Sequence, residues 1–489
     1  MGKKVTVLGA GISGLSAASF LAKEGFDVTV LEKNSTIGGR ARQFEAEGFV
    51  FDMGPSWYWM PDVFERFYNQ FGHTTSDFYE LVRLDPSYRI FWQDGTNTDV
   101  PAREEDLFAW FEQLEPGSSI HLKRFLKDAA YKYDVGMKDL VFKPGLSLTE
   151  FADLRVMRGL FKMHLLSSFS SYIRKYFKNE KILSLLEFPV LFLGATPQET
   201  PALYSLMNYA DISLGTWYPM GGMYKFVEAF EKIAKEQGVN IVTDQEVLRF
   251  EHDKDKLISA VTPHAKWDSD VFVSGADYHH TDKALLNGFA NYSDKYWDKR
   301  TMAPSSLLFY LGVNKKVDNL RHHNLFFDEP FAEHAREIYK DPKWPSAPLF
   351  YTCVPSKTDH SVAPEGMENI FLLVPIAPNL TDSEETREYY FEMLIDRLEQ
   401  RTGSSIRPHI VYKKSYCIND FKKDYHAFKG NAYGLANTLM QTAILKPTLK
   451  NKKLKNMYYT GQLTVPGPGV PPSIISGEVV AREVIKKFS

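Results

Sequence analysis

Three glycines near the N-terminus have the spacing of a dinucleotide-binding loop. Gly9, Gly11 and Gly14 form the pattern G-x-G-x-x-G directly after the apolar run Val5–Leu8. Glycines in this pattern let the backbone approach a pyrophosphate, which then lies at the positive N-terminus of the following helix. Glu32 follows at the distance expected for a carboxylate that accepts hydrogen bonds from ribose hydroxyls. The same carboxylate would repel a 2′-phosphate, so the pattern disfavours NADP.

A strand, a helix and a second strand are needed to position these residues. Val5–Leu8 predicts the first strand, and the Ala- and Leu-rich run Leu15–Glu24 predicts a helix that Gly25 ends. Val28–Leu31 predicts a second strand, with Glu32 at its end. A βαβ unit of this kind indicates an α/β fold with a parallel sheet. A glycine turn without a ligand is the alternative, and the flanking elements argue against it.

Two further glycine-rich segments follow this unit. Gly38, Gly39 and Arg40 lie after the second strand, and Gly48–Phe51 leads into a turn at Asp52–Pro55. Taken alone, these glycines predict simple turns and Arg40 predicts a surface cation.

Two distant parts of the chain repeat the strand and helix patterns. Met223–Ala234 has the apolar spacing of a helix with one buried face, after Gly221 and Gly222. Strand patterns follow at 240–243, 246–250 and 271–277, and again at 457–461. The proline-rich loop Pro466–Pro472 then precedes a predicted helix, Ser473–Lys487.

Together these segments resemble the flavoprotein family that includes amine oxidases, protoporphyrinogen oxidase, GDI-like proteins and carotenoid desaturases. The run from Gly461 to Gly477 resembles the carotenoid desaturase form of the C-terminal segment and not the amine oxidase form. The segments Met53–Pro61, Leu185–Gly194 and Pro201–Gly222 look like bacterial phytoene desaturases, most of all those of the Bacteroidetes type. The resemblance runs along almost the whole chain. It departs from the family at Gln462 and Leu463, where other members often have small residues.

The resemblance implies that the cofactor is FAD. The Gly39–Arg40 segment would pass the diphosphate, Gly54 and Pro55 would approach the flavin, and a backbone group of Val247 would contact the adenine. An ordinary core valine is the alternative for Val247. Neither cysteine lies in the C-terminal segment, so a covalent flavin is not expected. The residues that the resemblance assigns to FAD are Gly9, Ala10, Gly11, Ser13, Gly14, Glu32, Lys33, Gly39, Arg40, Gly54, Pro55, Val247, Gly461, Gly469 and Val470.

The expected architecture is an α/β fold with a discontinuous Rossmann-like FAD-binding domain of the GDI and amine oxidase type. A mixed-sheet substrate domain and a helical, membrane-facing lobe complete it. The FAD-binding domain is expected at residues 1–75, 220–285 and 450–489, the substrate domain at 76–129 and 286–449, and the lobe at 130–215. Within the substrate domain, 305–313 and 370–375 predict strands.

The family's chemistry predicts an FAD-dependent desaturase of the phytoene desaturase type, which extends the conjugation of a polyene hydrocarbon by hydride transfer to flavin. Two alternatives act on a carotenoid: 3,4-desaturation of a (1′-hydroxy) γ-carotene type of substrate, or isomerisation. A third is a GDI-like lipid carrier without enzymatic activity. Glu150, Asp153 and Glu187 are carboxylates that could accept a proton, but the sequence does not select among them. No catalytic side chain is therefore assigned.

Four consecutive apolar residues follow the Asp52–Pro55 turn. Trp57, Tyr58, Trp59 and Met60 would wall a tunnel to the flavin, or they would form a plain aromatic core.

The composition excludes several classes of protein. The 489 residues carry a net charge of −3, so no global field attracts nucleic acid. The only cysteines, Cys353 and Cys417, rule out a disulfide framework and a cysteine-rich zinc site, and no metal site is expected. No apolar run is long enough to span a bilayer, and no leader sequence is evident.

One basic segment suggests contact with a membrane. Arg155–Lys181 alternates Arg and Lys with apolar residues at helical spacing, a pattern typical of helices that lie in a membrane interface. A solvated helix pair is the alternative. With a carotenoid substrate, we expect a cytoplasmic protein that associates peripherally with the inner face of the cell membrane. We expect oxygen or a quinone as the electron acceptor.

Overall fold

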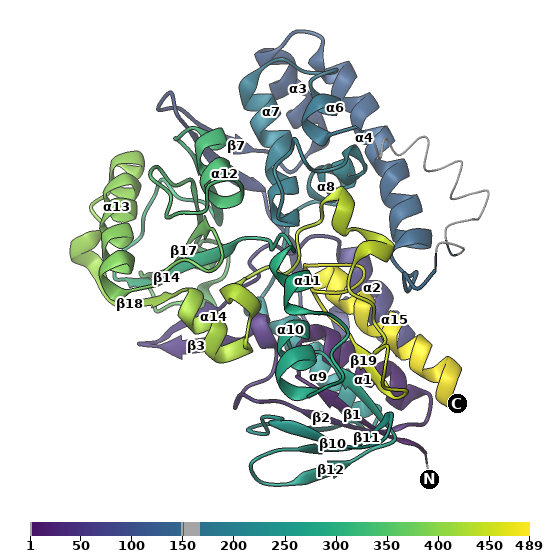
Figure 1. Ribbon diagram of the computed structural model, residues 1–489. Coiled ribbons are helices and arrows are strands. Elements are labelled where there is room, and N and C mark those ends of the chain that lie inside the picture. The colour runs from purple at the N-terminus through teal and green to yellow at the C-terminus, as the bar shows by residue number, and fades with distance from the viewer. Residues whose placement is uncertain (1, 148–149, 151–166) are drawn as a thin grey trace.

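The structure, a computed structural model, describes residues 2–147, 150 and 167–489 and has three parts (Figure 1). A parallel sheet with its covering helices lies at the bottom of the view, near both chain termini. A larger mixed sheet lies to the left, and a group of helices lies at the top.

The N-terminal βαβ pattern opens a five-stranded parallel sheet. Strands β1 (Lys4–Leu8) and β2 (Asp27–Leu31) pair in parallel, and α1 (Ile12–Lys23) connects them. The order in the sheet is β19-β13-β1-β2-β9, and the other strands are β9 (Asn240–Val242), β13 (Val271–Ser274) and β19 (Met457–Tyr459). Three distant segments therefore build one sheet, as a discontinuous nucleotide-binding domain requires. The exact domain boundaries stay predictions.

Three helices cover this sheet. The predicted helix after Gly222 is α9 (Tyr224–Glu236), and its apolar face is buried. At the C-terminus, α15 (Val470–Phe488) packs against α1, and a Cβ atom on Gly477 would lie 2.5 Å from the Ser13 carbonyl oxygen. This helix begins three residues before the predicted Ser473, because Pro471 and Pro472 occupy its first turn, where no N–H donor is needed.

The predicted strand at 246–250 is correct only at its end. Strand β10 (Arg249–Asp253) begins at Arg249 and forms a three-stranded antiparallel sheet with β11 (Lys256–Val261) and β12 (Lys266–Asp268). The chain before it, including Gln245 and Val247, lies along a cavity and makes no strand pairing.

The mixed sheet has two buried faces. Its order is β18-β14-β17-β16-β15-β6-β7, and only β15 and β6 pair in parallel. The bounds are β6 (Tyr88–Trp92), β7 (Asn97–Val100), β14 (Ser305–Val313), β15 (His323–Phe327), β16 (Phe350–Cys353), β17 (Glu368–Ile376) and β18 (Ile410–Tyr416). Both predicted strands are present as β14 and β17. One face packs under α13 (Glu384–Thr402), and alternate residues such as Leu308 on the opposite face line the cavity.

Two short antiparallel pairs and several small helices connect these parts. The pairs are β3 (Gln43–Ala46) with β4 (Phe49–Asp52), and β5 (Leu81–Arg83) with β8 (Trp217–Pro219). The helices are α2 (Pro61–Gln70), α10 (Tyr278–His280), α11 (Asp294–Asp298), α12 (Phe331–Tyr339) and α14 (Ile418–Tyr425).

The lobe at the top of Figure 1 is mostly helical where it is described. Its helices are α3 (Glu104–Leu114), α4 (Ser118–Val135), α6 (Phe169–Ile173), α7 (Glu180–Glu187) and α8 (Leu206–Asn208). Helix α4 crosses the expected boundary at residue 130. Of the basic segment, residues 155–166 lie outside the described residues, as does Asp153. Phe169, Ile173 and Phe177 are buried in the protein core. Among the helices that the structure describes, none is long and apolar enough to cross a membrane.

Candidate functional site

A cavity of about 590 Å³ joins the glycine-rich loops of the parallel sheet to the inner face of the mixed sheet. It brings together nearly all the residues that the sequence assigned to FAD. Those that line it are Gly9, Gly11, Ser13, Glu32, Lys33, Gly39, Arg40, Gly54, Pro55, Val247, Gly461, Gly469 and Val470. Ala10 and Gly14 belong to the glycine loop but do not line the cavity.

The glycine loop is built by close backbone contacts. A Cβ atom on Gly14 would lie 2.1 Å from the Gly9 carbonyl oxygen, so only glycine is compatible with this packing. Gly11 forms an isolated parallel bridge with Gly38, and a Cβ atom on Gly39 would lie 3.2 Å from the Gly11 Cα atom. The first two glycine-rich segments therefore touch through their backbones and leave room beside them for a ligand.

Glu32 holds this loop in place. It is 5% exposed, and its Oε2 atom accepts a hydrogen bond of 2.8 Å from the Ala10 N–H. Its Oε1 atom accepts from the backbone N–H and the side-chain amide of Asn34, both at 2.9 Å. A carboxylate has about four acceptor positions. Glu32 accepts three hydrogen bonds from the protein and therefore keeps capacity for about one more, from a ribose hydroxyl.

Charged side chains gather beside Glu32 at this end of the cavity. His426 Nε2 lies 2.6 Å from Glu246 Oε1 and 3.1 Å from Lys33 Nζ. The His426 ring stacks on His280 at 3.9 Å. Sequence reasoning identified Lys33 but missed Glu246, His280 and His426, which come from other segments of the chain.

Arg40 is a partly buried cation, and no carboxylate of the described residues forms an ion pair with it. Its guanidinium lies 5.0 Å from the centre of the Tyr425 ring, and its Nη2 atom donates to the Asn431 carbonyl at 3.4 Å. Its Nε atom has no hydrogen-bond partner among the described residues. Burial lowers the pKa of Arg40, and the negative charge of Asp277 acts in the opposite direction. A phosphate group would supply the missing partner.

Two more unpaired polar atoms lie beside the C-terminal loop. Lys446 Nζ and Asn437 Oδ1 are buried, and neither has a hydrogen-bond partner within the described chain. A Cβ atom on Gly467 would lie 3.0 Å from Asn437 Oδ1 and 3.2 Å from Lys446 Nζ. Burial lowers the pKa of Lys446 to about 7. Asn437 lines the cavity, and the sequence analysis assigned neither residue.

These features fit FAD. The glycine loops would hold the diphosphate, Glu32 the ribose, and Arg40 would offset phosphate charge. Arg40 and Asn437 line the cavity, and a polar group of the cofactor would satisfy their unpaired atoms. Val247 is buried and lines the cavity close to Glu246, so both a core role and an adenine contact agree with its position.

The far half of the cavity is apolar. The mixed sheet contributes Leu308, Leu325, Phe350, Tyr351, Phe371 and Leu373; α12 contributes Phe331, Ala335 and Ile338; and the helical lobe contributes Met137, Phe188, Leu206 and Met207. His334 also lies here. It bonds to the Pro375 carbonyl through Nε2 at 2.8 Å and accepts from the Leu349 N–H through Nδ1 at 3.0 Å. Burial lowers the pKa of His334 to about 4, so this half is uncharged at neutral pH.

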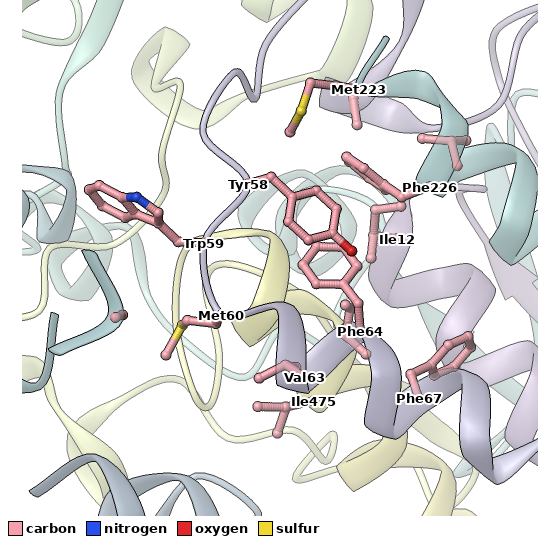
Figure 2. Close-up of a cluster of buried hydrophobic side chains, with 14 of the residues drawn as sticks. Ile12, Tyr58, Trp59, Met60, Val63, Phe64, Phe67, Met223, Phe226 and Ile475 are labelled. Carbon is pink, nitrogen blue, oxygen red and sulfur yellow. The ribbon is translucent and has the colours of Figure 1, made fainter. Parts of the chain in front are cut away.

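The aromatic run after Pro55 divides between the cavity and the core. Trp57, Trp59 and Met60 line the cavity, whereas Tyr58 points to the opposite side (Figure 2). The Tyr58 ring stacks on Phe64 at 4.3 Å, and its hydroxyl lies 2.8 Å from that of Tyr79. The expectation that all four residues wall a tunnel is therefore wrong for Tyr58. Neighbouring residues of an extended segment point to opposite sides.

The two candidate carboxylates that the structure describes, Glu150 and Glu187, do not line the cavity. Glu150 accepts hydrogen bonds from the backbone N–H groups of Gly145, Leu146 and Ser147, and Glu187 pairs with Arg174. The catalytic side chain stays unassigned.

Comparisons with known proteins agree with this geometry. A family model described as flavin containing amine oxidoreductase matches residues 12–485. The carotenoid 3,4-desaturase of Haloarcula japonica is 42% identical over 100% of this chain and 99% of its own length. The chain belongs to the carotenoid desaturase family. Another relative of this desaturase, the zeta-carotene-forming phytoene desaturase of Myxococcus xanthus, is 28% identical over 99% of this chain and 94% of its own.

A solved structure shows the same fold. An oxidoreductase from Methanosarcina mazei superimposes on this desaturase with a TM-score of 0.65 and 16% identity, covering 98% of this chain and 100% of its own. The resemblance seen in the sequence is confirmed, and so are FAD as the cofactor and the α/β fold with mixed sheets. The desaturase is an FAD-dependent oxidoreductase of the class that acts on CH–CH groups.

Proposed function

We propose that the protein removes two vicinal hydrogens from a carotenoid chain and so extends its conjugation. One observation carries the proposal. A single cavity has a glycine-lined, charged end that fits a nucleotide and an uncharged, aromatic end that fits a hydrocarbon. When bound, FAD supplies the hydride acceptor for an allylic carbon of the substrate.

The side chains of the apolar half bind the polyene and exclude water from it. Trp57 and Trp59 present rings that pack well against a flat conjugated chain. Neutral His334, with both ring nitrogens bonded to the backbone, adds no charge that would disfavour a hydrocarbon. The residues of the apolar half select a substrate by its apolar character and its length, and not by polar groups.

Two substrates have support. The sequence analysis favours phytoene. The 42% identity to a carotenoid 3,4-desaturase, against 28% to a phytoene desaturase, favours 3,4-desaturation of an already coloured carotenoid. We propose 3,4-desaturation as the stronger candidate. Both relatives align over nearly the whole chain, so the two identities can be compared directly.

The test is a product assay with the FAD-loaded protein. Liposomes containing phytoene, γ-carotene or 1′-hydroxy-γ-carotene are incubated with the protein, and the absorption spectrum and chromatogram are recorded. Each new double bond lengthens the chromophore, so the steps can be counted. Product only from the γ-carotene substrates supports 3,4-desaturation, and product from phytoene supports the phytoene type. A changed chromatogram with unchanged double-bond number indicates isomerisation. Carotenoid binding without conversion indicates a carrier and contradicts the proposal.

The same assay identifies the electron acceptor. We propose oxygen or a quinone, since two electrons must leave the flavin after each step. Anaerobic turnover that requires an added quinone selects the quinone, and turnover that requires only air selects oxygen.

We also propose that the enzyme associates with the inner face of the cell membrane from the cytoplasm. A carotenoid partitions into the bilayer, so the apolar cavity must be filled from there. Lys175 and Lys178 are exposed beside the buried residues Ile173 and Phe177, and they would contact anionic lipid headgroups. Arg174 is also exposed, but it pairs with Glu187.

Liposome co-sedimentation tests this proposal. The double variant Lys175→Glu, Lys178→Glu leaves the Arg174–Glu187 pair intact and reverses the local charge. We expect weaker sedimentation with anionic vesicles and unchanged FAD content. A control of equal charge change, Lys254→Glu with Lys256→Glu, lies in the hairpin of β10 and β11, far from the lobe (Figure 1). Equal sedimentation of both double variants would contradict the proposal.

A further inference from the structure

A second group of chemically active side chains lies behind the wall of the FAD cavity. His322, His323 and Cys353 are all buried, and one potential ligand atom from each lies within 4.8 Å of the other two. His323, the first residue of β15, pairs directly with Cys353, the last residue of β16. The sheet register therefore fixes the two residues beside each other, and His322 precedes the strand.

Each imidazole is oriented through one nitrogen and has the other unpaired. His322 Nδ1 lies 2.8 Å from the Thr358 hydroxyl, and His323 Nδ1 lies 2.6 Å from the Tyr351 hydroxyl. In the described parts of the chain, neither Nε2 atom has a hydrogen-bond partner, although both are fully buried. Metal-binding histidines show this arrangement, in which an outer hydrogen bond fixes the ring and the other nitrogen faces the ion.

A small cavity lies beside His322 and Cys353. Its volume is about 20 Å³, and it is lined by His322, Cys353, Asp52 and Met223, among others. This volume is enough for one water molecule or one ion. The site is separate from the FAD cavity, although the Trp57 ring, which lines that cavity, stacks on His323 at 4.1 Å.

We propose that His322, His323 and Cys353 form a binding site for one thiophilic transition-metal ion, zinc or copper. Two neutral imidazoles and a thiolate are a ligand set that both ions prefer. Metal binding releases the thiol proton. A divalent ion with one thiolate leaves one positive charge, and the Asp52 carboxylate beside the cavity offsets it. The Met223 thioether would complete a set typical of copper.

The geometry requires only a small adjustment. Around one zinc ion, nitrogen and sulfur ligands lie about 3.5 Å apart, so the three side chains must close by about 1 Å. The unpaired Nε2 atom of each ring would offer its lone pair to the ion. A bound ion would hold His323, and with it Trp57, in the wall of the FAD cavity. The site does not depend on the identity of the carotenoid.

Metal analysis of the full-length, FAD-loaded protein tests the proposal. The protein is expressed with added zinc and copper salts, desalted, and analysed by inductively coupled plasma mass spectrometry. We expect one ion per chain in the wild type and in Cys417→Ser, a matched control because Cys417 is also a buried free thiol. We expect a loss of at least about tenfold in Cys353→Ser and in His322→Gln.

A second measurement keeps the test valid if a variant fails to fold. Wild-type protein reconstituted with Co²⁺ should show thiolate-to-cobalt charge-transfer absorption. Copper as the native ion would give a thiolate-to-copper absorption band in addition to the flavin bands, and an electron paramagnetic resonance signal when oxidised, and zinc would give neither. Wild-type protein that lacks both bound metal and the cobalt–thiolate band would overturn the proposal. Metal retained in both Cys353→Ser and His322→Gln would also overturn it.

Discussion

The two halves of the FAD cavity are built on different physical principles. The nucleotide half is formed by backbone, where the absence of side chains at Gly14 and Gly39 lets three chain segments touch. The apolar half is formed by side chains that come from the mixed sheet, α12 and the helical lobe. The first half has no room for an added carbon at Gly14, where a Cβ atom would lie 2.1 Å from the Gly9 carbonyl oxygen. The apolar half tolerates a change in the shape of a side chain but not a change in its polarity.

The difference also separates two roles. Two cationic side chains near the cavity, Arg40 and Lys446, each have a buried nitrogen without a partner among the described residues, and they lie toward the nucleotide half and its C-terminal loop. In the apolar half, His334 has both nitrogens satisfied. Mutations in the nucleotide half should therefore affect cofactor binding, and mutations in the apolar half should affect substrate turnover.

The largest effect is expected from Gly14→Val. Its Cβ atom would lie 2.1 Å from a backbone oxygen that cannot move without displacing β1. Overpacking of this kind destabilises a fold by about 3 kcal/mol, so the variant should lose FAD and unfold at lower temperature. Flavin absorbance and thermal denaturation measure both effects. Gly136→Ala is the control, because its Cβ atom would meet only Leu206 Cδ2 at 3.6 Å. FAD content equal to the control would refute the backbone account.

The next effect tests the apolar half. Ile338→Asn places a polar amide on α12 in the apolar half of the cavity wall. A hydrocarbon substrate offers this amide no hydrogen-bond partner. A cost of about 1–3 kcal/mol corresponds to a fall of roughly 10- to 100-fold in kcat/KM, with FAD content unchanged. Glu333→Asn, exposed on the same helix, should leave both unchanged. Loss of FAD with normal turnover per remaining flavin would reverse the assignment of the two halves.

A smaller effect is expected from Glu32→Ala. The substitution removes the acceptor of the Ala10 and Asn34 N–H groups, which costs about 1–3 kcal/mol, so FAD affinity should fall by roughly tenfold or more. Glu32→Gln keeps an acceptor oxygen and should bind FAD with intermediate affinity. Titration of the apoproteins with FAD, followed by flavin fluorescence, measures the series. Glutamine and alanine variants of equal affinity would show that these hydrogen bonds do not shape the site.

The smallest effect concerns Lys446 in the apoprotein. Its pKa falls from 10.5 to about 7 on burial, so between these pH values the unfolded chain holds a proton that the folded chain has lost. The free energy of unfolding therefore rises with pH in this window, by about 1 kcal/mol per unit. Lys446→Met removes the titrating group and with it this rise in the free energy of unfolding. Urea unfolding at pH 7 and pH 9 should show a steeper rise for the wild type than for the variant. Parallel pH profiles would contradict the assignment.

The same variant connects Lys446 to the cofactor. If the orphan cation faces FAD, Lys446→Met should bind FAD more weakly than the wild type although its apoprotein is more stable. Unchanged FAD affinity would show that the side chain is only a buried charge.

The backbone half of the cavity could be predicted from the sequence because its information is local. The glycine spacing, the βαβ pattern and Glu32 lie within one short stretch. β1, α1 and β2 are present where predicted, although α1 begins at Ile12 and not at Leu15. Pro471 and Pro472 misled the prediction of the start of α15, because a proline-rich run also suits the first turn of a helix.

The rest could not be predicted because it depends on tertiary contacts. Asn437 and Lys446 have no local pattern and reach the cofactor loop only when the chain folds back. Tyr58 was grouped with its tryptophan neighbours because the sequence does not show which side of an extended segment faces the cavity. His323 and Cys353 lie thirty residues apart and meet only through the pairing of β15 and β16.

The most direct test of the two-half account is an anaerobic half-reaction. The FAD-loaded protein is mixed with its carotenoid in liposomes without any electron acceptor, and the flavin and polyene absorptions are followed together. We predict that the oxidised flavin absorption disappears as the polyene absorption moves to longer wavelength, with one flavin reduced for each double bond formed. A polyene that binds while the flavin stays oxidised would contradict the account.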